Sequence, residues 1–391
     1  MQSFGKGARI LLLLSVCVVT LAVRVWGQEV RQAPATRMPS PPPSLPAIKN
    51  CLGDPRGAEC LDQLFREALE SHSTLELLQW IDRLETEDAE LRRDCHPVVH
   101  AIGRETFRAK GTIHDSFSAC DQTCHSGCYH GSVERFLRGD ALYVQTHQHP
   151  SQRELKQKAS SACDPNISPN LRFQCLHGLG HAVMFFANYE LKASLAVCDA
   201  LPDEWSQSSC YGGVFMENVF NATNEKKNFR ATDYHYPCNQ LAEKYRSECY
   251  MMQTSRMTEM GLSTEALLAE CANAGAFVTP CVQSMGRDLS NTVRFGDPRA
   301  AATGCELARG THRLACMRGV IYALIDNTWD GRYALVFCAA FSADTDHESC
   351  LKESVQYLRT AFEKSSEDIN KDCARYAANS RRCIELSAAA K

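Results

Sequence analysis

The sequence predicts an all-α protein made of about ten helical hairpins, each stapled by a disulfide bond. Three observations lead to this fold class. The chain of 391 residues contains 21 cysteines. Most of these cysteines recur with a period in the mid-thirties, which is typical of repeats that contain two helices. An apolar N-terminal segment indicates export to an oxidising compartment, where cysteines form disulfides rather than metal thiolates.

The export signal is predicted at residues 1–27. Lys6 and Arg9 precede an apolar run over residues 10–23, and Gly27 offers a small residue at the point of cleavage. The run is short for a membrane span, which favours cleavage; an uncleaved segment would instead anchor the protein in the membrane. We therefore expect a secreted or periplasmic protein with no stable membrane span once the signal is removed.

The segment that follows the signal is rich in proline. Residues 28–48 contain six prolines and are expected to form an extended, disordered linker, so that the folded repeat domain covers residues 49–391. The composition, 44% hydrophobic and 23% charged, is that of a soluble globular protein. The chain beyond the signal is mildly acidic and has no dense run of Lys or Arg, which argues against nucleic acid as a partner.

One column of cysteines marks the start of the second helix in each hairpin. Its members are 32 to 39 residues apart, except for one step of 47 residues between Cys128 and Cys175. The long step predicts an insertion at residues 146–153, whose His147 and His149 we expect on a surface loop. A second column precedes the first by 8 to 12 residues, near the end of the first helix of each hairpin.

A bond between the two columns would staple each hairpin across its turn, and the count of cysteines supports this pairing. Cys95 and Cys124 are left over and are predicted to bond to each other, linking adjacent repeats; the alternative is that Cys124 replaces Cys120 as the partner of Cys128. Each short loop contributes about 2–3 kcal/mol to stability in the chain-entropy model. The nine predicted staples are Cys51–Cys60, Cys120–Cys128, Cys163–Cys175, Cys198–Cys210, Cys238–Cys249, Cys271–Cys281, Cys305–Cys316, Cys338–Cys350 and Cys373–Cys383.

Small residues on the second helix indicate that neighbouring hairpins pack closely. Gly131, Gly178, Gly213 and Gly319 each lie three residues after a cysteine of the first column. The cysteine and glycine columns together resemble the tetratricopeptide and Sel1-type repeat class, in particular its cysteine-stapled members. This resemblance implies an α-solenoid, either open or closed into a ring, and it implies no particular activity.

Histidines break the equivalence of the repeats in only one part of the chain. Three consecutive second helices carry a pair of polar side chains at i and i+4, which places both members of a pair on one helix face. In the first of these helices the frame is displaced by one residue. The pairs are His96 with His100, His130 with Glu134, and His177 with His181.

Imidazole and carboxylate side chains are ligands for Fe, Cu and Zn, so the three pairs predict a transition-metal centre with one or two ions within residues 95–185. Glu134 has two functional interpretations, as a metal ligand or as the general base for a metal-bound water. His125 lies near the pairs and is expected to support the ligands from outside the coordination shell. The alternative is that these are solvated or packing residues, as a lone pair of this type usually is.

The predicted function is that of an exported metal-dependent oxidoreductase or hydrolase, and two alternatives remain. The first is a solenoid scaffold that binds a peptide, a protein or a small molecule in its groove, with structural histidines. The second is a c-type haem protein, because Cys120, Cys124 and His125 form a lengthened haem-attachment motif, although the disulfides explain both cysteines better. Met216, Met251 and Met252 lie in or beside the histidine columns, where packing is favoured over copper binding.

Overall fold

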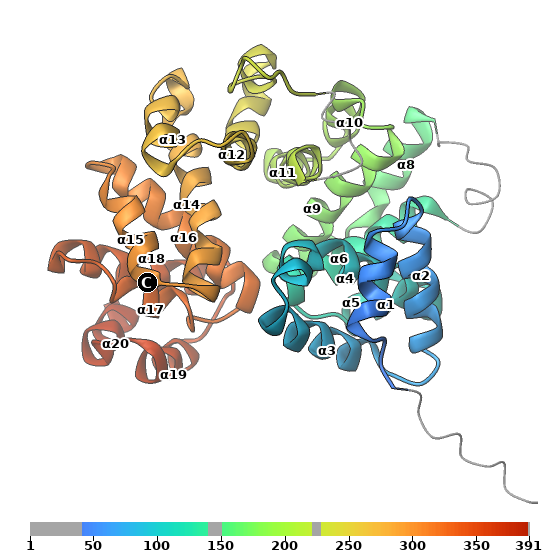
Figure 1. Ribbon diagram of the computed structural model, residues 1–391, viewed down its shortest axis with the longest axis horizontal. Coiled ribbons are helices and arrows are strands. Elements are labelled where there is room, and N and C mark those ends of the chain that lie inside the picture. Colours follow the sequence, from blue (N-terminus) through green and yellow to red (C-terminus); the bar gives the residue numbers. More distant parts are fainter. Residues whose placement is uncertain (1–40, 140–150, 221–227, 390–391) are drawn as a thin grey trace, which may run out of the picture. The chain divides into compact units, whose positions relative to one another are not determined.

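The computed structural model describes residues 41–139, 151–220 and 228–389, and it confirms the all-α class (Figure 1). Every described residue belongs to one compact unit, which covers residues 40–391. Within the described ranges the only extended pairing is an isolated bridge between Arg230 and Asp233. The predicted signal peptide, most of the proline-rich linker, and His147 and His149 lie outside these ranges.

The helices form hairpins in chain order, and each hairpin comprises a first and a second helix. The first helices are α1 (Leu45–Leu52), α3 (Thr74–Glu87), α5 (Ile113–Phe117), α8 (Gln152–Ala162), α10 (Leu191–Cys198), the 3₁₀ turn η2 (Cys238–Gln240), α13 (Thr264–Cys271), α15 (Pro298–Glu306), α17 (Ala334–Cys338) and α19 (Ser366–Tyr376). The second helices are α2 (Gly57–Ala68), α4 (Ala89–Lys110), α6 (Thr123–Arg138), α9 (Pro169–Phe186), α11 (Glu204–Phe220), α12 (Glu243–Glu259), α14 (Val278–Phe295), α16 (Thr311–Thr328), α18 (Asp344–Thr360) and α20 (Ser380–Ala389). A further short 3₁₀ turn, η3 (Gly275–Phe277), precedes α14.

Helix boundaries follow capping side chains more closely than they follow the predicted ranges. Helix α1 begins at Leu45, inside the segment predicted as linker, and the hydroxyl of Ser44 accepts the N–H of Ala47. Helix α11 begins at Glu204, and the carboxylate of Asp203 accepts the N–H of Ser206 at 2.8 Å. A short acceptor side chain therefore determines where the hairpin turn ends.

The disulfide framework is the predicted one. All nine hairpin staples are present, and the tenth bond joins Cys95 of α4 to Cys124 of α6. The Cα atoms of the bonded pairs are 5.3 to 5.8 Å apart, which is the usual separation. Twenty paired cysteines are consistent with an oxidising extracellular environment.

Successive second helices are in contact with one another from α4 through α6, α9, α11, α12, α14, α16 and α18 to α20. Glycines allow the closest of these approaches. A Cβ atom added at Gly131 of α6 would lie 2.0 Å from the carbonyl oxygen of His100 in α4. A Cβ atom at Gly213 of α11 would lie 1.9 Å from the carbonyl oxygen of His177 in α9. The glycine column is thus where one helix backbone lies against the next.

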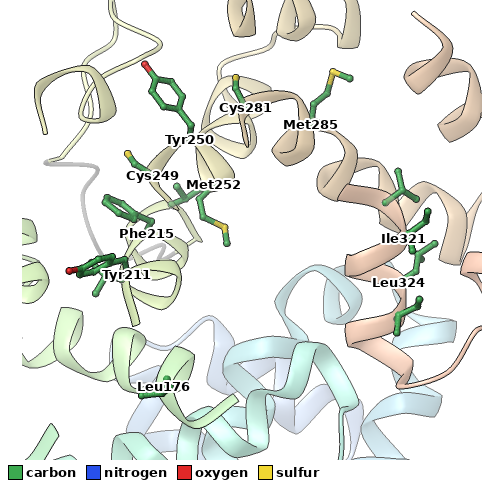
Figure 2. Packing of buried hydrophobic residues seen from close by; sticks show 14 of the residues in the cluster. Leu176, Tyr211, Phe215, Cys249, Tyr250, Met252, Cys281, Met285, Ile321 and Leu324 are labelled. Atoms are coloured by element: carbon green, nitrogen blue, oxygen red, sulfur yellow. The ribbon is translucent and has the colours of Figure 1, made fainter. Parts of the chain in front are cut away.

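Apolar side chains from these helices form a continuous core across successive hairpins. Figure 2 shows Leu176 of α9, Phe215 of α11, Met252 of α12, Met285 of α14 and Leu324 of α16 in this cluster. A smaller core joins α1 to α4 with the start of α6. Because the layers are buried between neighbouring hairpins, each second helix has little freedom to shift relative to the next.

Segments far apart in the sequence also meet within the second unit. Helix α16 contacts α6, and Trp329 stacks on Tyr129 with ring centroids 5.8 Å apart. Arg294 of α14 forms an ion pair with buried Glu85 of α3 at 2.9 Å. These contacts bring α16 next to α6, which carries one of the histidine pairs, and α14 next to α3.

Among the described residues, none of the helices combines the length and the apolar character needed to cross a membrane.

Candidate metal centre

The three predicted pairs meet on one side of three neighbouring helices. Helix α4 carries His96 and His100, α6 carries His130 and Glu134, and α9 carries His177 and His181. Gly131 brings α6 against α4, and a Cβ atom at Gly178 of α9 would lie 2.8 Å from the Cα of His130. The glycine column therefore sets the short helix separations that allow side chains from three helices to reach a common point.

Five imidazole rings form a compact cluster. The centroid of His96 lies 5.3 Å from that of His130 and 5.5 Å from that of His181, and the last two are 5.1 Å apart. His96, His130 and His181 each offer a ligand atom, and these three atoms all lie within 4.8 Å of one another. One ring from each of three helices thus faces the same small volume, as a shared metal ion requires.

Hydrogen bonds orient each of these three rings. Nδ1 of His96 lies 2.8 Å from the carbonyl oxygen of Cys124, and Nδ1 of His181 lies 2.8 Å from a carboxylate oxygen of Glu217. Nε2 of His130 lies 3.1 Å from the side-chain oxygen of Gln174. Because each partner is an acceptor, these nitrogens carry the hydrogen. The lone pair is therefore on Nε2 of His96, on Nδ1 of His130 and on Nε2 of His181. Nδ1 of His130 and Nε2 of His181 are buried without a hydrogen-bond partner.

His100 provides a fourth nitrogen next to this group. Its Nε2 lies 3.0 Å from Nε2 of His96, so the two nitrogens must share either a proton or a cation. A separation of roughly 3 Å is also the distance between two nitrogens bound at right angles to one ion with bonds of about 2.0–2.1 Å. The pair at i and i+4 on α4 therefore has the spacing of a chelate.

Glu134 lies beside the cluster and is held by a buried arginine. Its carboxylate is 2.9 Å from Arg104 and 3.5 Å from Nδ1 of His100. Burial acts to raise the pKa of Glu134, but the charge of Arg104, helped by His100, holds that pKa well below its ordinary value. Arg104 is itself paired with buried Asp62 at 2.7 Å. Glu134 is thus an ionised carboxylate that faces the far nitrogen of His100.

The other two predicted residues occupy the edges of the cluster. The ring of His177 lies 5.1 Å from that of His181, yet its Nε2 is directed at the sulfur of Met216, 3.2 Å away. The ring of His125 lies 6.2 Å from that of His96. Burial, followed by the charges of Arg294 and Arg287, lowers the pKa of His125 to about 3. His125 and His96 are both partly exposed, so the cluster meets solvent on their side.

Three contributors to the cluster were not predicted from the sequence: Gln174, Glu217 and the carbonyl group of Cys124. Met216 was placed in the histidine columns, and its sulfur contacts Nε2 of His177. Gln174 directly precedes Cys175, and Glu217 and Met216 lie one repeat beyond the histidines on α11, where the histidine pattern has ended. The only available signal was the shared helix face. Met216 and Glu217 lie six and seven residues after Cys210, just as His181 and Ala182 lie six and seven residues after Cys175.

A second group of potential ligands, Glu85 with Cys95 and Cys124, does not form a metal site, because the two sulfurs are bonded to each other. The same bond bears on haem attachment. Cys120 is bonded to Cys128 and Cys124 to Cys95, so neither sulfur of the lengthened motif is available for a thioether link.

Comparison of the chain with models of protein families, with curated proteins and with solved structures found no match. The fold and the cluster by themselves define its class, a disulfide-rich helical protein with a candidate histidine metal centre.

The buried histidines predict that the metal-free protein loses stability in mild acid. Burial lowers the pKa of His130 and His177 well below the ordinary 6.5, and nearby histidines lower it further. Below pH 6.5 the unfolded chain therefore binds protons that the folded chain does not, and each such group costs up to about 1.4 kcal/mol per pH unit. The free energy of unfolding should be level above pH 7 and fall steeply between pH 6.5 and 4.5. Urea titrations at a series of pH values measure it, the His130→Gln variant should flatten the slope, and a pH-independent midpoint would contradict the burial of these rings.

The tenth disulfide is predicted to hold His96 in place. Cys124, His125 and Ser126 have φ angles of 48°, 58° and 61°, a left-handed turn that costs roughly 1–2 kcal/mol for each residue. The bond to Cys95 maintains this turn, and the turn directs the Cys124 carbonyl at His96. The double variant Cys95→Ser/Cys124→Ser should bind Zn(II) about 10- to 100-fold more weakly, as loss of an orienting partner usually does.

The control for this variant is Cys373→Ser/Cys383→Ser, which removes a hairpin staple far along the chain from the histidines. It should lower thermal stability and leave Zn(II) affinity unchanged. Equal affinities of the two double variants in a competitive chelator titration would show that the Cys95–Cys124 bond has no specific role in the centre.

Proposed function

We propose that this protein is an exported metalloenzyme with a single transition-metal ion bound by His96, His130 and His181, and with His100 as a fourth nitrogen ligand. The observation that carries the proposal is the meeting of three ring nitrogens from three helices within 4.8 Å of one another. The acceptors on the opposite ring nitrogens support it, because ligating histidines usually donate their other N–H to a carboxylate or carbonyl oxygen.

The donor set favours a catalytic centre over a structural one. Structural zinc sites are mostly closed by cysteine thiolates, whereas the twenty cysteines in the described ranges are all in disulfides. Neutral imidazoles bind Zn, Cu or Fe. They bring no negative charge to the ion, so the ion keeps its full positive charge. A bound ion would supply Lewis-acid chemistry if it is zinc, or oxidative chemistry if it is copper or iron.

The remaining predicted residues take supporting roles in this proposal. Glu134 accepts from Nδ1 of His100 and so directs the other ring nitrogen towards the ion, while Arg104 keeps Glu134 ionised. Glu217 does the same for His181. His125 and the partly exposed His96 form the side from which a substrate reaches the ion.

We also infer that the hairpins form an α-solenoid of the tetratricopeptide or Sel1 type, and that residues 1–27 are a signal peptide. The continuous contacts between successive second helices support a solenoid. The Arg294–Glu85 ion pair and the contact of α6 with α16 support a closed rather than an open arrangement.

The metal content of protein purified from an oxidising export system tests the proposed centre. We expect about one equivalent of zinc, copper or iron per chain, and its loss in the double variant His130→Ala/His181→Ala. Replacement of the exposed His114 on α5 is the matched control and should leave the metal content unchanged. Metal far below one equivalent after reconstitution with each ion in turn would exclude the centre.

A second measurement separates an enzyme-like centre from a closed one. The Co(II)-substituted protein should change its visible absorption when azide is added, because a catalytic site accepts an external ligand, here in a fifth position beside the four histidine nitrogens. An unchanged spectrum at saturating azide would mean that the ion is fully enclosed, and the histidines would then serve a structural function.

A further inference from the structure

Arginines outnumber carboxylates in a cluster of side chains from α2, α4 and α6. Among the described residues this cluster contains five guanidinium groups and three largely buried carboxylates, so it carries an excess of two positive charges. Glu67 on α2 is exposed to solvent and accepts a hydrogen bond from Gln63, so it adds little to the balance. The arginines are Arg66, Arg104, Arg108, Arg135 and Arg138, and the carboxylates are Asp62, Glu105 and Glu134.

Each carboxylate of the cluster is already bound by an arginine. Arg104 donates to Asp62 at 2.7 Å and to Glu134 at 2.9 Å, and a nitrogen of Arg138 lies 3.6 Å from the second oxygen of Asp62. The third carboxylate, Glu105, has no exposed surface and accepts from two guanidinium groups, those of Arg66 and Arg108.

Arg135 of α6 is the arginine of the cluster that lacks a carboxylate. Within the described ranges its guanidinium forms neither a hydrogen bond nor an ion pair, although the side chain is only partly exposed. Burial lowers the pKa of Arg135, and the charges of Arg138 and Arg66 lower it further against the opposing effect of Glu105. An arginine stays charged in a protein, so the charge of Arg135 is left to be balanced by an anion from solution.

The end of α6 does not by itself account for the excess of arginine. Cations in the last turn of a helix interact favourably with its dipole, and Arg135 and Arg138 lie in that turn. However, Nζ of Lys158 already donates to the carbonyl oxygen of Leu137 at 3.0 Å, and the N–H of Gly139 donates to the carbonyl oxygen of Arg135. Because these donors satisfy the helix end, the guanidinium of Arg135 is available to a ligand.

Guanidinium groups present their N–H donors in a fork that matches the oxygens of phosphate and sulfate. Arg66 binds Glu105 through Nε and Nη2, at 3.0 and 3.2 Å, which leaves its Nη1 for another acceptor, and 44% of its side chain is exposed. We propose that Arg135 and Arg66, with Arg138 beside them, form a binding site for a phosphate- or sulfate-type oxyanion with two negative charges. The site uses none of the histidines, so it does not rest on the proposed metal centre.

Phosphate binding by the full oxidised protein tests this site. At constant ionic strength in chloride, added inorganic phosphate should shift the ¹⁵Nε resonance of Arg135 in the wild type. Arg135→Gln should bind phosphate at least about tenfold more weakly, because a charge-assisted donor is lost. Arg153→Gln removes an exposed arginine of α8 and should bind phosphate as the wild type does. Glycerol phosphate, titrated in parallel, shows whether the site takes the free anion or the phosphate group of a larger molecule, and either result supports the proposal.

Thermal melting of the same proteins gives a second readout. In chloride alone Arg135→Gln should melt at or above the wild-type temperature, because it loses a charge that has no partner. Phosphate should raise the melting temperature of the wild type and of Arg153→Gln but not that of Arg135→Gln. A variant that melts well below the wild type in chloride would show that the guanidinium already has a stabilising partner, and it would overturn the proposal.

Two further results would overturn it: an Arg135 resonance in the wild type that phosphate does not shift, or equal phosphate affinity of the wild type and Arg135→Gln. The resonance is measured on unaltered protein, so it decides the question even if the variant fails to fold. Phosphate affinity should be the same with and without zinc, whatever the outcome for the histidine centre. Phosphate that binds only after zinc loading would lie on the metal and would also contradict the proposed site.

Discussion

Replacement of His130 or His181 by alanine is expected to lower the affinity of the protein for Zn(II) by more than about a hundredfold. Each change removes one of three converging nitrogens, and loss of a ligand should exceed the 10- to 100-fold effect of losing an orienting partner. His181→Ala also leaves the carboxylate of Glu217 without the ring that it orients. A competitive titration with a chromophoric chelator measures the affinities.

Three comparisons make this result specific. His114→Ala should bind as the wild type does, because His114 is exposed on α5. His177→Ala should reduce Zn(II) affinity much less than His181→Ala, because Nε2 of His177 faces Met216. Glu217→Gln keeps an acceptor oxygen, so its Zn(II) affinity should lie between those of the wild type and His181→Ala. Equal, small losses for His181→Ala and His114→Ala would contradict the assignment of His181 as a ligand.

Gly131→Ala is expected to destabilise the oxidised protein by about 3 kcal/mol or more, in spite of the better helix propensity of alanine. The added Cβ atom would lie 2.0 Å from the carbonyl oxygen of His100 and 2.7 Å from its carbonyl carbon. Both of these atoms belong to a helix backbone, so α4 and α6 would have to separate. The same separation would move His130 away from His96, and Zn(II) affinity should fall together with stability.

Gly53→Ala provides the matched control, because its Cβ atom would meet nothing closer than 3.7 Å and its φ angle of −84° suits any residue. Its free energy of unfolding should be within about 0.5 kcal/mol of the wild-type value. Chemical denaturation of the two variants gives the comparison. If Gly131→Ala unfolds at the wild-type midpoint, the glycine column does not set the helix separation.

Local, periodic signals made much of this structure predictable. Most cysteines pair within hairpins, so their partners lie close in sequence. Cys95 and Cys124 were left over, and their predicted bond is present. The pairs at i and i+4 placed two imidazoles on one helix face wherever the repeat frame was known. The one-residue displacement at His96 did not prevent convergence, since its ring lies 5.3 Å from that of His130.

The unpredicted features depend on rotamers and on contacts between repeats. Glu217 and Gln174 are 36 and 44 residues from the histidines they orient, and the histidine pattern does not extend to either of them. The left-handed turn at residues 124–126 contains no glycine that would predict its positive φ angles. Helix register placed His177 with His181, but the direction of its ring depends on Met216, which belongs to the next repeat. The sequence therefore predicts where the cluster lies. It does not predict which of its histidines are metal ligands and which only lie beside them.

The central claim, a metal ion held by histidines from three neighbouring helices, is tested most directly by diffraction from zinc-loaded crystals at the zinc absorption edge. The anomalous map should contain a peak roughly 2 Å from Nε2 of His96, Nδ1 of His130 and Nε2 of His181. Protein that carries one equivalent of zinc but has its anomalous peak elsewhere, or no peak among these three rings, would contradict the account.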